Sequence, residues 1–150
     1  AARVCSTLNV RAVFAGLDSW PTATGPASPI YAAKYVPFNE LFPHARAIVH
    51  HGGVGTTGAC LRAGKPQVVV AYANDEFDNA ARVARLGCGV GCRAVSVLGR
   101  ALGEGQLRTA LTKAITPRCE QRAAEVGRIT SAEDGATLAA KRVSSAVTGH

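Results

Sequence analysis

The sequence predicts an α/β fold, a Rossmann-like parallel sheet with helices on both faces. Short apolar runs bounded by turn residues alternate with stretches of helical periodicity, as in a sheet whose strands are connected by helices. The clearest unit is a strand at 45–50, a glycine-rich turn, a helix at 55–62 and a strand at 67–70. Its 150 residues, 47% of them hydrophobic, fit one domain, residues 1–150, with a single core.

The first third of the chain predicts strands separated by turns. The predicted elements are a strand at 9–16, a loop at 17–29 that holds the only tryptophan (Trp20), a strand at 30–36, a turn with one helical turn at 37–42, and the strand at 45–50.

The remainder is mostly helical. After the helix at 55–62 and the strand at 67–70 we expect a helix at 78–86 closed by Gly87, a strand at 90–97, a helix at 104–115 ended by Pro117, a helix at 120–129, and a helix at 131–147 opened by a capping box at Ser131.

Composition and charge narrow the function classes. The five cysteines are scattered, without zinc-type pairs, so we expect reduced thiols and no metal site. The net charge of +7 suits an anionic ligand, but the basic residues are dispersed and aromatics are few, which argues against nucleic acid. No apolar run is long enough to span a bilayer, and no secretory pattern opens the sequence, so we expect a cytoplasmic protein without stable membrane insertion.

The segment from His50 to Gly58 (HHGGVGTTG) lies between a predicted strand and a predicted helix. Glycines allow close approach of a ligand, and the free amides and dipole of a helix N-terminus favour phosphate. His51 and the hydroxyls of Thr56 and Thr57 add donors. For His50, which points to the opposite face of the strand, we expect a core or supporting role.

A second polar cluster, Tyr72 to Asn79, follows the next predicted strand and emerges at the same edge of the sheet. There the carboxylates of Asp75 and Glu76 are placed to accept hydrogen bonds from ligand hydroxyls. Capping of the following helix is the alternative role for both aspartates, and we assign it to Asp78.

These segments together resemble the donor-binding motif of GT-B nucleotide-sugar glycosyltransferases, the family of UDP-glycosyltransferases and bacterial antibiotic and sterol glycosyltransferases. The resemblance runs from Tyr35 to Gly91 and is carried, in order, by Tyr35-Val36-Pro37, by His51 to Thr57, by Ala63 to Pro66, and by Asn74-Asp75-Glu76 with Asn79-Ala80.

The resemblance implies roles for individual residues. Tyr35 would stack on the nucleobase and Val36 would read its edge through the main chain. His51, Gly52, Gly53, Gly55, Thr56 and Thr57 would hold the diphosphate, and Asp75 and Glu76 would bind the donor sugar, a UDP- or dTDP-sugar. Many relatives have glutamine where Glu76 stands, and plant-type members have a ribose-binding glutamate where this chain has Ala59.

The implied reaction is inverting transfer of a sugar to an acceptor hydroxyl, without a metal or other cofactor. By the resemblance, the acceptor site and catalytic base belong to an N-terminal domain outside these residues, so the catalytic base is unknown, and a strand from the middle of the sheet precedes Ala1. We therefore expect an altered strand order or a homodimer, or else a separate acceptor-domain chain as partner.

Two other functions stay open. Gly53 to Gly58 also fits the GxGxxG fingerprint of an NAD(P)-binding oxidoreductase, with Asp75 about 20 residues further on. An inactive partner-binding fragment is the second alternative.

Overall fold

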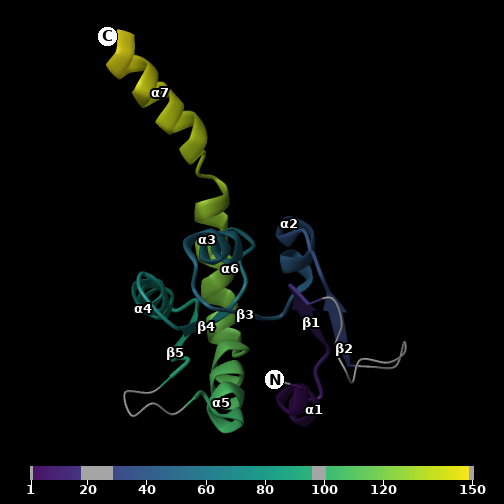
Figure 1. Cartoon of the computed structure of the whole chain (residues 1–150). Helices are drawn as coiled ribbons and strands as arrows, with labels where there is room; N and C mark the ends of the chain where they lie inside the picture. Colours follow the sequence, from purple (N-terminus) through teal and green to yellow (C-terminus); the bar gives the residue numbers. More distant parts are fainter. Residues whose placement is uncertain (1, 18–28, 96–100, 149–150) are drawn as a thin grey trace.

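The computed structural model describes residues 2–17, 29–95 and 101–148 (Figure 1). In chain order its elements are α1 (Ala2–Leu8), β1 (Ala12–Ala15), β2 (Ile30–Ala33), α2 (Phe38–Leu41), the 3-10 turn η1 (Phe42–His44), β3 (Ile48–His50), α3 (Val54–Arg62), β4 (Gln67–Ala71), α4 (Glu76–Leu86), β5 (Gly89–Arg93), α5 (Glu104–Ala114), α6 (Pro117–Ser131) and α7 (Gly135–Thr148).

All pairing between named strands is parallel. β1 pairs with β2 in a two-stranded sheet, and β3, β4 and β5 form a three-stranded sheet with β4 in the middle. Within the described residues no strand pairing joins the two sheets, which Figure 1 draws as separate groups of arrows. The expected altered strand order is therefore wrong. Each strand pairs with a near neighbour in the chain, and none of the named strands pairs across the gap between the two sheets.

The core is built on both faces of β4. Val69 packs with Ala80 and Val83 of α4, whereas Val68 packs with Ala110 of α5. Successive residues of a strand point to opposite faces, so a run of apolar residues covered on both sides is the pattern of a buried parallel strand. The predicted class, α/β with helices on both faces, is confirmed.

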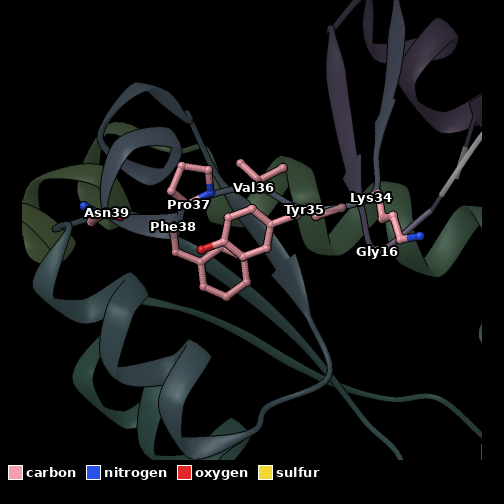
Figure 2. Close-up of a pocket in the computed structure, with 8 residues that line it drawn as sticks. Gly16, Lys34, Tyr35, Val36, Pro37, Phe38 and Asn39 are labelled. Carbon is pink, nitrogen blue, oxygen red and sulfur yellow. The ribbon is translucent and has the colours of Figure 1, made fainter.

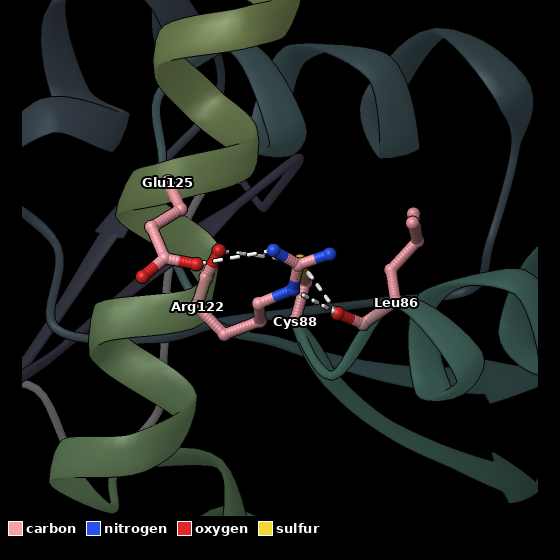
Figure 3. Close-up of polar contacts among 4 residues, drawn as sticks. All are labelled: Leu86, Cys88, Arg122 and Glu125. Atoms are coloured by element: carbon pink, nitrogen blue, oxygen red, sulfur yellow. Dashed lines mark hydrogen bonds and ion pairs between the residues drawn. The ribbon is translucent and has the colours of Figure 1, made fainter.

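The C-terminal end of α4 is fastened to α6 (Figure 3). The Arg122 guanidinium donates from Nε to the carbonyl oxygen of Leu86 at 3.0 Å and pairs with Glu125 at 3.0 Å. The Cys88 thiol lies 3.7 Å from the same Leu86 carbonyl. Gly87 closes the helix with φ of +72°, as predicted.

Several element boundaries differ from prediction. The helix α1 was not predicted, and the first strand is confined to β1. Pro117 does not only end a helix but is the first residue of α6, where its missing N–H costs nothing. The capping box at Ser131 is wrong, because α6 continues through Ser131 and the Asp134 carboxylate instead accepts the Thr137 N–H at 3.1 Å, near the start of α7. Trp20 and the end of the strand predicted at 90–97 lie outside the described residues.

All five cysteines are free thiols, as expected. Burial raises the pKa of the Cys60 thiol to about 12, so this group is an uncharged core residue. Among the residues that the structure describes, no helix combines the length and the hydropathy of a membrane span.

Candidate functional site

The glycine turn joins the carboxyl end of β3 to the N-terminus of α3, as predicted. The first backbone bond of α3 runs from Thr57 N–H to Gly53 O at 2.9 Å. The amides of Val54, Gly55 and Thr56 come before that bond, in the turn where helix N–H groups lack intrahelical acceptors. An added Cβ on Gly55 would meet nothing within 4 Å, so the space beside this residue is open.

Gly52 is held by the protein on every side. Its φ of +107° is unfavourable for a residue with a side chain, and an added Cβ would lie 2.7 Å from Val69 Cγ1. Its N–H donates to His50 Nδ1 at 3.1 Å, and its carbonyl accepts from Asn79 Nδ2 at 2.9 Å. Gly52 thus shapes the turn, with both backbone polar groups occupied inside the molecule.

His51 lies over the start of α3. Its side chain is on an exposed residue, and its Nε2 is 2.8 Å from the position that a Cβ on Gly53 would occupy. Gly53 is the N-cap residue of α3. The imidazole therefore stands beside the helix N-terminus, which is the geometry expected of a phosphate donor.

The two threonines differ. Thr57 is buried and its hydroxyl donates to the Gly53 carbonyl at 3.0 Å. Thr56 is half-buried in the same turn. Of the two hydroxyls expected in the phosphate turn, the Thr57 hydroxyl is thus engaged in holding the turn itself.

The acidic cluster follows β4, beside the same turn. Glu76 Oε2 accepts the backbone N–H groups of Tyr72 at 2.7 Å and Ala73 at 3.0 Å, and these bonds lower the pKa of the Glu76 carboxyl, with a smaller contribution from His51. Asp75 is exposed at the N-cap position of α4.

The predicted capping role of Asp78 is wrong. α4 begins at Glu76, two residues earlier than expected, so Asp78 lies within its first turn. There its carboxylate pairs with Arg82 one helical turn later, at 2.6 Å.

Asn79 connects the two clusters, a role that its sequence position did not reveal. Its Nδ2 donates to the Gly52 carbonyl at 2.9 Å and to Asp75 Oδ2 at 3.3 Å. One amide on α4 therefore fixes both the glycine turn and the nearest acidic side chain. The only sequence signal was its place in the Asn79-Ala80 motif.

His50 has the supporting role predicted for it. Its ring is half-buried, with Nδ1 accepting from Gly52 N–H and Nε2 lying 2.9 Å from Gln67 Oε1. Burial lowers the pKa of His50, and the charge of His51 acts in the same direction, while the hydrogen bond to Gln67 opposes them.

Tyr35 and Val36 lie after β2 on the wall of a cavity of about 410 Å³ (Figure 2). The Tyr35 side chain is 81% exposed, so it is not the end of a buried strand. The cavity is lined by Ala15, Gly16, Lys34, Tyr35, Val36, Pro37, Phe38 and Asn39. The lining includes none of the glycine-turn residues, so this cavity alone does not bring the two groups of predicted site residues together.

Known proteins resemble this chain in sequence and in fold. The family model described as the erythromycin biosynthesis protein CIII-like C-terminal domain matches residues 22–141. The sterol 3-beta-glucosyltransferase of Eremothecium gossypii is 38% identical over 112 residues, which are 73% of this chain and 8% of that protein.

Solved structures agree with the sequence relatives. The glycosyltransferase of kitacinnamycin superposes with a TM-score of 0.76 at 26% identity, covering 95% of this chain and 37% of that one. The glycosyltransferase VinC, solved in complex with dTDP, gives a TM-score of 0.61 at 31% identity, covering 73% of this chain and 27% of VinC. Because the family model spans most of the sequence, this chain belongs to the erythromycin biosynthesis protein CIII-like C-terminal domain family, a family of GT-B glycosyltransferase domains.

Proposed function

We propose that this chain is the nucleotide-sugar-binding domain of an inverting glycosyltransferase. The observation that carries the proposal is the open N-terminus of α3, where three amides precede the first helical hydrogen bond and His51 stands beside them. The chain spans 8% of the sterol glucosyltransferase and 37% of the kitacinnamycin enzyme, so transferase activity itself is part of the proposal.

The diphosphate is assigned to the outer side of the glycine turn. His51, the amides of Gly55 and Thr56, and the Thr56 hydroxyl supply donors. Gly52 and Gly53 contribute by shape, because a side chain on Gly52 would collide with Val69 and one on Gly53 would displace the His51 ring. Thr57 closes the turn from within.

The nucleobase and the donor sugar are assigned to two further groups of residues. Tyr35 and Val36 form the nucleobase wall of the cavity, and the dTDP in VinC supports a UDP- or dTDP-sugar as donor. Asp75 and Glu76 bind the sugar hydroxyls. Since Glu76 Oε2 accepts from its own turn, Oε1 is the oxygen proposed to accept from the donor sugar.

In the proposed reaction an acceptor hydroxyl attacks the anomeric carbon. The bond from that carbon to the diphosphate oxygen breaks, and a base outside these residues takes the hydroxyl proton. Negative charge grows on the leaving diphosphate, where each charge-assisted hydrogen bond contributes about 1.5–3 kcal/mol. The proposed donor set consists of amides, a hydroxyl and an imidazole, and it includes no metal or other cofactor.

The partner proposed for this domain is an acceptor-binding domain, in the same polypeptide or in a separate chain, with a homodimer as the alternative assembly. Support comes from the split sheet: Val13 of β1 and Val49 of β3 are 43% and 47% exposed although both are strand residues. Sedimentation of the purified chain distinguishes the monomer from the homodimer. A cytoplasmic location is part of the same proposal, supported by the free thiols.

Calorimetric titration with UDP, dTDP, GDP and NAD tests the proposed function. We expect UDP or dTDP to bind and NAD not to bind. His51→Ala should weaken nucleotide binding by about tenfold or more, the cost of one charge-assisted hydrogen bond. His44→Ala removes an exposed histidine of η1, which is not part of the glycine turn, and serves as the matched control.

Other outcomes would change the assignment. Binding of NAD alone would favour the oxidoreductase, which the family membership does not support. Binding of no nucleotide together with a stable complex with another chain would favour the partner-binding fragment. We expect the isolated chain to transfer no sugar, because the acceptor site lies elsewhere.

A further inference from the structure

Gln67 is a buried polar residue at the start of β4. Its side chain has 0% exposure, in a strand that continues Val68, Val69, Val70. Its Oε1 lies 2.9 Å from His50 Nε2, while its Nε2 is buried with no hydrogen-bond partner in the described part of the chain. A buried amide without an acceptor destabilises the fold, so packing alone does not account for glutamine at this position.

The neighbouring contacts fix the protonation of His50. The Gly52 N–H donates to His50 Nδ1, so Nδ1 carries a lone pair and no proton. In the neutral ring the proton then sits on Nε2, where it is donated to Gln67 Oε1. If the Gln67 side-chain amide were turned over, its NH₂ group would donate to His50 Nε2. Both ring nitrogens would then be acceptors, which a neutral imidazole does not allow.

The chain of bonds therefore has one direction, from the Gly52 amide to the His50 ring and from the ring to Gln67. An imidazolium would present an N–H to the Gly52 N–H, and the bond between them would be lost. Burial of the ring, which lowers the pKa of His50, favours the neutral form that this geometry needs.

We propose that His50 and Gln67 are positioning residues for the diphosphate turn. Gln67 holds His50 as the Nε2–H tautomer, and His50 in turn holds the Gly52 amide inward, so that the outward amides at Gly55 and Thr56 are the ones presented to phosphate. The inference rests on the proposed function for its ligand. Its geometry stands on the Gln67–His50–Gly52 contacts alone.

The first test reads the tautomer directly. Long-range proton–nitrogen correlation spectra of the ¹⁵N-labelled chain, without ligand, should show His50 protonated on Nε2. In Gln67→Met, which has similar volume and only a weak acceptor, the Nε2–H loses its amide acceptor. A fraction of the Nδ1–H tautomer should then appear, and in that fraction the bond from the Gly52 N–H is lost. A wild-type His50 protonated on Nδ1, or a tautomer unchanged in Gln67→Met, would overturn the proposal.

The second test separates positioning from packing. His50→Asn keeps an acceptor oxygen near the Nδ1 position, whereas His50→Leu removes it. In titrations with UDP and dTDP, His50→Leu should bind about five- to tenfold more weakly than wild type, the effect of one lost hydrogen bond, and His50→Asn should stay within about twofold. Equal affinities of the two variants would overturn the positioning role.

The control is Cys88→Ala, which removes a buried thiol that packs against Ala123 and Val126 of α6. It should lower the free energy of unfolding while leaving nucleotide affinity unchanged, which shows that instability alone does not mimic the His50→Leu result. If the wild-type chain binds neither UDP nor dTDP, the proposed function fails. The positioning role then fails with it, while the spectra still report whether the Gln67–His50–Gly52 contacts exist.

Discussion

The glycine turn and the segment after β2 are both assigned to the donor, yet they are built in opposite ways. In the turn, both backbone groups of Gly52 are bonded, by His50 and Asn79, and the Thr57 hydroxyl closes back on Gly53. After β2, the Tyr35 ring is 81% exposed. The surface proposed for phosphate is therefore held by contacts within the protein. The surface proposed for the nucleobase has an exposed ring instead.

This difference follows from what each surface recognises. Phosphate is bound by amides whose directions must converge, so the backbone has to be held rigidly. A nucleobase is bound by stacking on an aromatic face, which needs exposed area more than exact direction. Mutations in the turn should accordingly affect stability and binding together, and mutations at the base surface should affect binding alone.

The largest effect is expected for Gly52→Ala. The new Cβ would lie 2.7 Å from Val69 Cγ1 and 3.2 Å from the Glu76 carbonyl oxygen, on a backbone with φ of +107°. Left-handed strain and overpacking together should lower the free energy of unfolding by about 2–4 kcal/mol, measured by urea denaturation.

Gly58→Ala is the matched control within α3. Gly58 is helical and exposed, and a Cβ there would meet nothing within 4 Å. It should stabilise the chain by about 0.5–1 kcal/mol, because alanine is the better helix former. If both variants lose stability alike, the turn is no more constrained than an ordinary helical glycine, and the contrast with the base surface fails.

The sequence predicted the part of the site that depends on local order. A parallel strand, a glycine turn and a helix in succession place the turn at the carboxyl end of the strand, so the position of His51 at the start of α3 followed from the spacing. The contacts that hold the turn did not follow, because Gln67 and Asn79 reach it from β4 and α4 across long stretches of chain.

The division of the strands into two sheets could not be predicted from the order and spacing of the elements. Each strand was foreseen approximately, but pairing depends on which edges find a neighbour in space. β1 pairs with β2 and β3 with β4, and these local pairings left the two sheets separate. The predicted helix starts at Ser131 and Asp78 were wrong by only a few residues. Helix ends shift by that much with little change in energy, so sequence patterns locate them poorly.

An intermediate effect, on binding alone, is expected for Tyr35→Ala. Loss of a stacking ring weakens base binding by about 1–3 kcal/mol, so UDP and dTDP should bind at least about fivefold more weakly while the urea midpoint stays the same. Tyr31→Ala is the control, because Tyr31 is also exposed, at 68%, but lies in β2 outside the cavity lining. Equal losses of nucleotide affinity in the two variants would show that the nucleobase does not stack on Tyr35.

The smallest effect is expected for Glu76→Gln, and it appears as a pH dependence. Two backbone amides lower the pKa of the Glu76 carboxyl in the folded chain, so ionised Glu76 stabilises the fold above the ordinary titration range of glutamate. That contribution is lost as the pH falls through the lowered folded value. Wild type should therefore be more stable than Glu76→Gln in urea at pH 7, and the gap should narrow toward pH 3. Glu40→Gln, in exposed α2, removes the same charge away from the turn and controls for net charge. If the difference in stability between wild type and Glu76→Gln stays constant with pH, the Glu76 carboxylate does not hold the Tyr72 and Ala73 amides in solution. Glu76 would then resemble Tyr35, an exposed side chain without a role in stability.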